Sequence, residues 1–140
     1  MRVTGIDRDA SATAPLQPLA EIINADIEAG PWPVNGRQFD LVLVSNYLWR
    51  PLLPLITAAV APGGWLIYET FGLGQQTVGR PTRPDFLLAP GELLSSCPDL
   101  HVVAFEDGFA DGRFVQRIAA VRAAQEALYP RYALDSKAAE

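Results

Sequence analysis

Four apolar segments of the sequence are each followed by a polar side chain that could bind a ligand: Asp7, Asp26, Asn46 and Glu69. Carboxylates accept hydrogen bonds from hydroxyl and amino groups, and an amide both donates and accepts them. In open α/β sheets, ligands bind outside the carboxyl ends of the strands. The pattern therefore predicts a binding site at one edge of a sheet. Ordinary polar strand ends in a structural α/β domain are the open alternative.

The two aspartates suit different parts of a nucleoside. Asp7 could accept two hydrogen bonds from a ribose diol, as carboxylates do in dinucleotide-binding domains. Asp26 could accept from an adenine amino group while the adjacent Ile27 contacts the flat ring. Aspartate is also common in turns and helix caps, so each residue alone has a structural explanation.

The elements that must position these side chains alternate between strands and helices. Strands are predicted at residues 2–6, 22–25, 41–44, 64–71, 101–108 and 111–123, and helices near Leu16, within 50–62 and from 91 to 97. The continuous apolar run 41–44 is typical of a central parallel strand buried on both faces. The long loop 72–90 is of a length that usually marks a functional lid or a disordered segment.

This alternation predicts an α/β fold with a mostly parallel sheet and a C-terminal antiparallel hairpin. Residues 1–123 would form one incomplete domain, and residues 124–140 a helical or frayed tail. One domain also suits a chain of 140 residues.

The composition and net charge of the chain exclude some classes of protein and of binding site. The chain is 49% hydrophobic with a net charge of −5, so it is globular and lacks the basic face of a nucleic-acid-binding protein. The single Cys97 excludes an internal disulfide, and the single His101 excludes a histidine cluster. Without a signal peptide or an apolar run of about 18 residues, we expect a cytoplasmic protein with no membrane partner.

Five stretches of the sequence resemble class I S-adenosylmethionine-dependent methyltransferases. In chain order they are VTGIDRD, NADIEAGPWP, FDLVLVSNYLWRPLL, APGGWLIYETF and GRPTRPDFLLAPGELL. The resemblance is narrower to a bacterial tellurite- and thiopurine-type group. It implies a Rossmann-like, seven-stranded sheet whose final antiparallel strand matches residues 113–121. It also implies methyl transfer from S-adenosylmethionine to a small-molecule acceptor.

The resemblance assigns roles to particular residues. It implies cofactor contacts for Asp7, Arg8, Asp26, Ile27, Asn46 and Tyr47, and acceptor contacts for Trp49, Glu69, Arg80, Arg83 and Phe86. The sequence names no clear catalytic base. In-line methyl transfer depends largely on holding the acceptor close and aligned, so positioning can supply much of the rate.

Methyltransferases of this class carry a strand, a Gly-rich turn of the type G-x-G-x-G and a helix before the segment at which these 140 residues begin. Three explanations compete. The start codon is assigned too far downstream, which we favour; the chain is a truncated remnant, folded differently or paired with another chain; or the two flanking strands pair directly. We expect a version extended upstream to bind S-adenosylhomocysteine at least about tenfold more tightly.

Two other function classes stay open. A non-catalytic remnant could act as an interaction or dimerisation module, because an unpaired sheet edge invites pairing with another chain. A homodimer is therefore among the expected assemblies. A nicotinamide-dependent Rossmann enzyme would also use Asp7, but no Tyr-Lys or histidine pattern for its catalysis is present.

Overall fold

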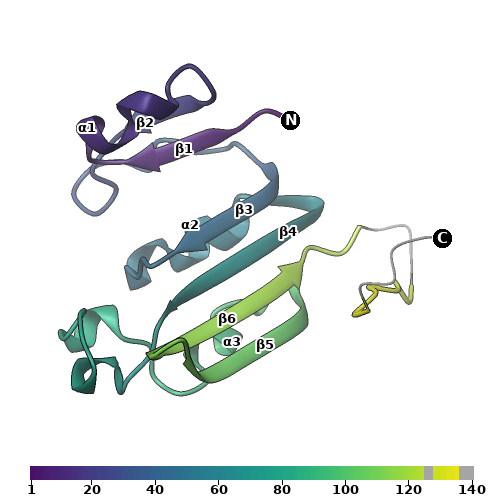
Figure 1. Cartoon of the computed structure of the whole chain (residues 1–140). Coiled ribbons are helices and arrows are strands. Elements are labelled where there is room, and N and C mark those ends of the chain that lie inside the picture. The colour runs from purple at the N-terminus through teal and green to yellow at the C-terminus, as the bar shows by residue number, and fades with distance from the viewer. Residues whose placement is uncertain (125–127, 136–140) are drawn as a thin grey trace. The chain divides into compact units, whose positions relative to one another are not determined.

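The computed structural model describes residues 1–124 and 128–135 and divides into two compact units, Met1–Arg37 and Gln38–Glu140 (Figure 1). The first unit holds two parallel strands, β1 (Thr4–Asp7) and β2 (Glu21–Asn24). Between them lie α1 (Ala10–Thr13) and a 3-10 turn, Ala14–Leu16.

The helix of the first unit begins earlier than the predicted position near Leu16. Asp9 caps α1, because its carboxylate accepts hydrogen bonds from the backbone N–H groups of Ser11 (2.9 Å) and Ala12 (3.0 Å). Such a cap satisfies N–H groups that have no partner within the helix. Pro15 falls in the 3-10 turn after α1, where it starts a new turn instead of breaking the helix.

The second unit is built on a four-stranded sheet with the order β3-β4-β6-β5. Its elements are β3 (Phe39–Ser45), α2 (Leu53–Ala58), β4 (Val60–Phe71), α3 (Glu92–Ser95), β5 (His101–Ala110) and β6 (Arg113–Val121). β3 and β4 are parallel, and β6 is antiparallel to both β4 and β5. The predicted α/β fold with a C-terminal antiparallel hairpin is confirmed.

The hairpin of β5 and β6 turns at Asp111 and Gly112, whose φ angles are 53° and 75°. A two-residue turn with both φ angles positive matches the right-handed twist of the flanking strands, and Asp-Gly is a favoured pair for it. The turn therefore includes Asp111 and Gly112, which were predicted to begin the strand 111–123.

The helix predicted within residues 50–62 is shorter than expected. It consists of a 3-10 turn, Arg50–Leu52, followed by α2, which ends at Ala58. β4 then begins at Val60, so the Pro-Gly-Gly sequence lies inside the strand and not before it. The pairing register jumps from Phe39 with Val60 to Leu41 with Trp65, which places the intervening residues in an irregularity of the ladder.

One face of the four-stranded sheet is the core. α2 packs against β4 and α3 against β6 (Figure 1). The buried side chains on this side include Leu53, Ile56, Leu66, Tyr68, Leu93 and Ile118. Burial of this apolar surface is the main favourable term in the folding of the unit.

The other face of the sheet, which we call the open face, is more exposed than predicted. Residues 41–44 were expected to be buried on both faces, but the side chains of Leu41 and Leu43 are 53% and 68% exposed. β3 is an edge strand of its sheet, and α2 and α3 cover the opposite face. Leu41 pairs with Trp65 and Leu43 with Ile67, so these four residues share the open face.

The single seven-stranded sheet implied by the resemblance is not what the described residues form. They form separate sheets of two and four strands, and β1 and β3 belong to different sheets. Direct pairing of the two flanking strands is therefore not observed. Residues 128–135 of the tail contain no helix, while residues 125–127 and 136–140 lie outside the described part. Within residues 1–124 and 128–135, no helix is long and apolar enough to span a membrane.

Candidate functional site

Asp7 ends β1 with one carboxylate oxygen engaged and the other available. Its Oδ1 accepts a hydrogen bond from the backbone N–H of Asp9 at 2.8 Å, while its Oδ2 bonds to none of the described residues. Its backbone carbonyl accepts from the side-chain amide of Asn24 (3.1 Å) and from the N–H of Ala25 (3.2 Å). The side chain is exposed, so the second oxygen can accept a hydrogen bond from a ligand.

Asp26 follows β2 and has a similar arrangement. Its Oδ1 accepts from the N–H groups of Glu28 (3.0 Å) and Ala29 (3.3 Å), which is an Asx-type turn. Ile27 is half-buried beside it. Because β1 and β2 are parallel, Asp7 and Asp26 follow their strands at the same edge. Each carboxylate accepts hydrogen bonds from nearby backbone N–H groups through one oxygen only. A structural role in the turn is therefore compatible with ligand binding through the other oxygen.

Arg8 lies at the same edge of the first unit, directly after Asp7, and is exposed. Asn24 was not predicted as a site residue. It is the register partner of Asp7 and also donates to the hydroxyl of the buried Thr13 at 2.9 Å. It therefore joins the end of β1 to α1. In the sequence, Asn24 lies two residues before Asp26, at the end of the predicted strand 22–25. An amide at a strand end can donate and accept hydrogen bonds and so can bridge two segments of the chain.

In the second unit, the chain leaves β3 through Asn46, whose φ is 53°. This left-handed conformation is uncommon outside glycine, and asparagine adopts it more readily than most residues. The Asn46 N–H donates to the carbonyl of Glu69 at 2.9 Å, which fixes the turn against β4. The left-handed backbone of Asn46 therefore turns the chain out of the sheet at the end of β3.

Tyr47 and Trp49 continue this turn. The carbonyl of Tyr47 accepts a hydrogen bond from the Tyr68 hydroxyl at 2.6 Å. Burial holds the pKa of Tyr68 well above its usual range, so this hydroxyl stays protonated and acts as a structural donor. Trp49 is half-buried and immediately precedes the Arg50–Leu52 turn. Both predicted site residues thus lie directly after the β3 strand end.

Four side chains form a polar row across the open face at the carboxyl ends of β3 and β4. The sheet register aligns Ser45 with Glu69, Glu69 with Arg117, and Arg117 with Glu106. Arg117 donates through Nε to Glu69 and through Nη1 to Glu106, the latter at 3.2 Å. Arg117 therefore bridges the carboxylates of Glu69 and Glu106 across the open face.

Arg113 lies next to this polar row. Its Nη2 is 3.6 Å from Oε1 of Glu69, and its guanidinium carbon lies 5.9 Å from the centre of the Phe71 ring. Glu69 was predicted from the sequence, whereas Arg113 and Arg117 were not. Their even spacing along a predicted strand, which places both on one face, was the available signal.

The loop 72–90 is ordered and is held in place by glutamines, so the disordered alternative of the prediction is not observed. Gln75 donates to the carbonyl of Arg80 (3.0 Å) and accepts from the N–H of Phe114 (2.9 Å). Gln116 donates to the carbonyl of Ala89 (2.7 Å) and accepts from the N–H of Leu93 (3.0 Å). Both glutamines are buried, so these bonds tie the two ends of the loop to the sheet.

Arg50 supports the middle of the same loop. It donates to both carboxylate oxygens of Glu92, at 2.7 and 2.9 Å, and to the carbonyls of Asp85 and Leu87, each at 2.9 Å. The hydrogen bonds from Arg50 hold the pKa of Glu92 below its usual range. The predicted acceptor-binding loop is thus an ordered element positioned from distant parts of the chain.

The predicted acceptor residues of this loop lie near one another. Arg83 pairs with Asp85 at 3.0 Å, and its guanidinium lies 5.2 Å from the centre of the Phe86 ring. Arg80 is exposed and makes no hydrogen bond through its guanidinium to the described residues. Arg80 is therefore the better placed of the two arginines to meet an anionic group.

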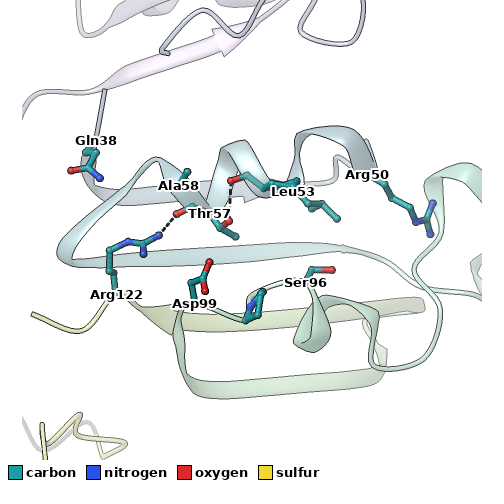
Figure 2. Close-up of a pocket in the computed structure, with 10 residues that line it drawn as sticks. Gln38, Arg50, Leu53, Thr57, Ala58, Ser96, Asp99 and Arg122 are labelled. Carbon is teal, nitrogen blue, oxygen red and sulfur yellow. Dashed lines mark hydrogen bonds between the residues drawn. The ribbon is translucent and has the colours of Figure 1, made fainter. Parts of the chain in front are cut away.

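A separate groove of about 630 Å³ runs along α2 (Figure 2). Arg122 lies on its wall and donates to the carbonyls of Val60 and Thr57, both at 2.8 Å. The guanidinium of Arg122 is therefore held by backbone carbonyls. Other lining residues are Arg50, Leu53, Ser96 and Asp99. None of the predicted site residues lines this groove, so we do not assign the binding site to it.

Two other side chains of reactive types, Cys97 and His101, pack against other parts of the structure. Cys97 is buried, and burial raises the pKa of its thiol to about 11. His101 begins β5, and its ring lies 5.2 Å from that of Tyr132. Among residues 1–124 and 128–135, no group of three histidine, cysteine, aspartate or glutamate side chains could hold a metal ion.

Solved structures share this fold over most of the chain. N-methyltransferase NodS from Bradyrhizobium japonicum WM9 matches with a TM-score of 0.63 and 18% identity, over 87% of this chain and 74% of NodS. TehB from Haemophilus influenzae matches with a TM-score of 0.66 and 14% identity, over 86% of this chain and 50% of TehB. The fold is that of part of a class I S-adenosylmethionine-dependent methyltransferase.

The same fold also occurs in a protein that is named as a cyclase and not as a methyltransferase. The [4+2]-cyclase SpnF matches with a TM-score of 0.60 and 14% identity, over 89% of this chain and 67% of SpnF. A second matching NodS structure is a complex with S-adenosyl-L-homocysteine. The chain spans from 50% to 74% of the length of NodS, TehB and SpnF in these matches. Comparisons with protein-family models and with curated proteins found no match.

Proposed function

We propose that the chain forms the cofactor- and acceptor-binding part of an S-adenosylmethionine-dependent methyltransferase that acts on a small molecule. The observation that carries this proposal is Asp7, which ends a parallel strand of a methyltransferase fold with one carboxylate oxygen fixed and the other available. Ligands of open α/β sheets bind at this edge. The NodS complex with S-adenosyl-L-homocysteine supports the choice of cofactor.

The residues of the first unit suit the adenosine portion of the cofactor. The available Oδ2 of Asp7 would accept from a ribose hydroxyl, while its Oδ1 stays bonded to Asp9. Asp26 also has one carboxylate oxygen engaged in its turn, which leaves the other for the adenine amino group, and Ile27 would contact the ring. Hydrogen bonds to a charged carboxylate contribute about 1.5–3 kcal/mol each.

The second unit carries a polar strand end of its own. Asn46 has a backbone fixed by Glu69 and a side-chain amide at the end of β3, which could donate a hydrogen bond to a ligand or accept one from it. S-adenosylmethionine supplies, when bound, a sulfonium methyl group for in-line transfer. The Glu69 carboxylate is paired with Arg117, and the buried Tyr68 hydroxyl donates to a backbone carbonyl, so both side chains already have partners within the chain. We therefore propose that this chain contributes chiefly by binding and orienting its ligands.

Calorimetric titration with S-adenosylhomocysteine tests the proposal. Asp7→Ala should weaken binding at least about tenfold, because a charge-assisted hydrogen bond is lost. Asp99→Ala, which removes an exposed carboxylate in the second unit, is the matched control and should leave the affinity unchanged. Equal affinities of the wild-type chain and Asp7→Ala would contradict the assigned ribose contact. Absence of binding by a version extended upstream would remove the cofactor from the proposal.

A second candidate function is a non-catalytic interaction module. The exposed Leu41 and Leu43 on an edge strand favour it, since such surfaces commonly mark contacts with other chains. Because SpnF shares the fold, cofactor binding alone would not establish methyl transfer. Release of S-adenosylhomocysteine from S-adenosylmethionine in the presence of candidate acceptors separates the two candidates.

A further inference from the structure

The loop 72–90 returns to the sheet at the point where β3 ends. The N–H of Asn46, through which the chain leaves β3, donates to the carbonyl of Glu69 on β4 at 2.9 Å. Two residues further along β4, the carbonyl of Phe71 accepts from the N–H of Leu88 at 3.0 Å, beside a parallel bridge between the two segments. The end of the loop therefore continues the parallel pairing with β4 from the place where β3 stops.

Arg50 holds the segment that leads to Leu88 from both sides of Phe86. Its Nη1 donates to the backbone carbonyl of Asp85 and its Nη2 to that of Leu87, each at 2.9 Å. Phe86 lies between these two residues and is half-buried. One guanidinium thus restrains the backbone before and after the Phe86 ring.

Glu92 fixes the direction of this guanidinium. Its two carboxylate oxygens accept from Nε and Nη2 of Arg50 at 2.7 and 2.9 Å, and such bidentate pairing sets the orientation of both planar groups. Oε1 of Glu92 also accepts from the N–H of Ala89 at 2.9 Å. The ion pair therefore makes three hydrogen bonds to the backbone of residues 85–89.

We propose that Arg50 is a positioning residue for the acceptor: it holds Phe86 next to the carboxyl end of β3. This inference rests on the proposed function, in which the loop binds the acceptor. Arg50 makes four hydrogen bonds within the chain, so it acts through the loop and not by touching the acceptor. In-line transfer depends on a closely held acceptor, so a residue that fixes the acceptor-binding segment affects the reaction from outside it.

Arg50→Lys and Arg122→Lys are a matched pair of variants for testing this role. Lysine keeps the charge, but its single ammonium nitrogen cannot reproduce the fork of donors that Arg50 directs at Glu92 and at two carbonyls. Arg122 also donates to two backbone carbonyls, those of Val60 and Thr57, which belong to β4 and α2 and not to the loop. We expect both variants to remain folded by circular dichroism and to unfold at lower urea concentration than the wild-type chain.

Amide hydrogen exchange followed by NMR tests the positioning itself. In Arg50→Lys, the amides of residues 86–89 should exchange at least about tenfold faster than in the wild-type chain, while the amides of β4 and β6 keep their rates. Arg122→Lys should leave the exchange of residues 86–89 unchanged. Unchanged exchange of these residues in Arg50→Lys, or a rise shared equally by β4 and β6, would overturn the proposal.

Steady-state kinetics tests the link to the acceptor, with release of S-adenosylhomocysteine measured for a panel of small thiols, amines and phenols. For the acceptor that is turned over fastest, Arg50→Lys should raise the KM at least about tenfold and leave the KM for S-adenosylmethionine unchanged. Arg122→Lys should leave both KM values unchanged. A purely structural role of Arg50 would lower the apparent kcat without changing the acceptor KM, and that result would overturn the proposal.

Phe86→Ala tests whether Arg50 acts through Phe86. In that background, adding Arg50→Lys should change the acceptor KM by less than about twofold, because the two residues belong to one arrangement. Fully additive effects would contradict action through Phe86. A wild-type chain that turns over none of the panel contradicts the proposed function and this inference with it, whereas turnover with an unchanged acceptor KM in Arg50→Lys contradicts the role of Arg50 alone.

Discussion

The side-chain amide of Asn24 donates a hydrogen bond to the backbone carbonyl of Asp7 at 3.1 Å. The same amide donates to the hydroxyl of Thr13 at 2.9 Å, so one side chain joins the ends of β1 and β2 to α1. The position of the Asp7 carboxylate is therefore set by contacts on both sides of the strand end. This arrangement holds the backbone of Asp7 in place at the strand end.

Asn24→Ala should lower the free energy of unfolding by about 1 kcal/mol, since two partly exposed hydrogen bonds are lost. It should also weaken binding of S-adenosylhomocysteine, because Asp7 is no longer held in place. Asn35→Ala, an exposed position in the following loop, is the control. Urea unfolding and calorimetry measure the two effects. A variant that loses stability but keeps full affinity would separate Asn24 from the site.

Gln116→Leu should destabilise the second unit by about 2–4 kcal/mol. The change keeps the side-chain volume roughly constant but leaves the N–H of Leu93 and the carbonyl of Ala89 without their partners. Each unsatisfied buried group costs about 1–3 kcal/mol. Gln38→Leu makes the same change at an exposed position and should alter stability by less than about 0.5 kcal/mol. Similar denaturation midpoints for the two variants would argue against Gln116 as the anchor of the loop.

The ion pair of Arg50 and Glu92 should make stability depend on acid pH. Because hydrogen bonds from Arg50 lower the folded-state pKa of Glu92, its contribution is fully present above its ordinary value of 4.5. The contribution is lost as the pH falls through the lower, folded-state pKa. Glu92→Gln should therefore cost about 1 kcal/mol or less at neutral pH, given solvent screening, and the difference should shrink in acid.

Urea unfolding of the wild-type chain and of Glu92→Gln at a series of pH values measures this dependence. Asp99→Asn makes the same change of charge away from Arg50 and controls for net charge. A stability difference between wild type and Glu92→Gln that stays constant down to the lowest pH would show that the ion pair does not carry the effect.

Cys97 should react slowly with thiol reagents in the folded chain. Its thiol is buried with a pKa of about 11, against an ordinary value of 9.0, and only the thiolate is reactive. At mildly alkaline pH, ionisation alone predicts a reaction about a hundredfold slower than in denaturant. Ala123→Cys adds an exposed thiol and should react at once. Rapid labelling of the native wild-type chain would contradict this burial.

The sequence predicted the strands and the polar residues at their ends because both depend on local patterns. Apolar runs that end at Asp7 and Ser45, and an antiparallel hairpin formed by the last two strands, correspond to observed elements. The start of α1 could also have been predicted from Asp9, because aspartate is a favoured residue at the N-cap of a helix.

Long-range relationships could not be predicted in the same way. An apolar run such as that of β3 looks the same whether its faces are covered or open, so the exposure of Leu43 was unforeseen. Arg50 and Glu92 are 42 residues apart, and no periodic pattern connects them. The order of the 72–90 loop likewise depends on Gln116, which arrives from a later strand.

Titration of the isotope-labelled chain with S-adenosylhomocysteine, followed by NMR of the backbone amides, tests the proposed cofactor site most directly, because NMR detects weak as well as tight binding. We expect saturable shifts at Asp7 and Asp26, with Thr57 and Ser96 of the α2 groove unchanged. Shifts confined to that groove, or no shifts at the highest attainable ligand concentration, would contradict the proposed site.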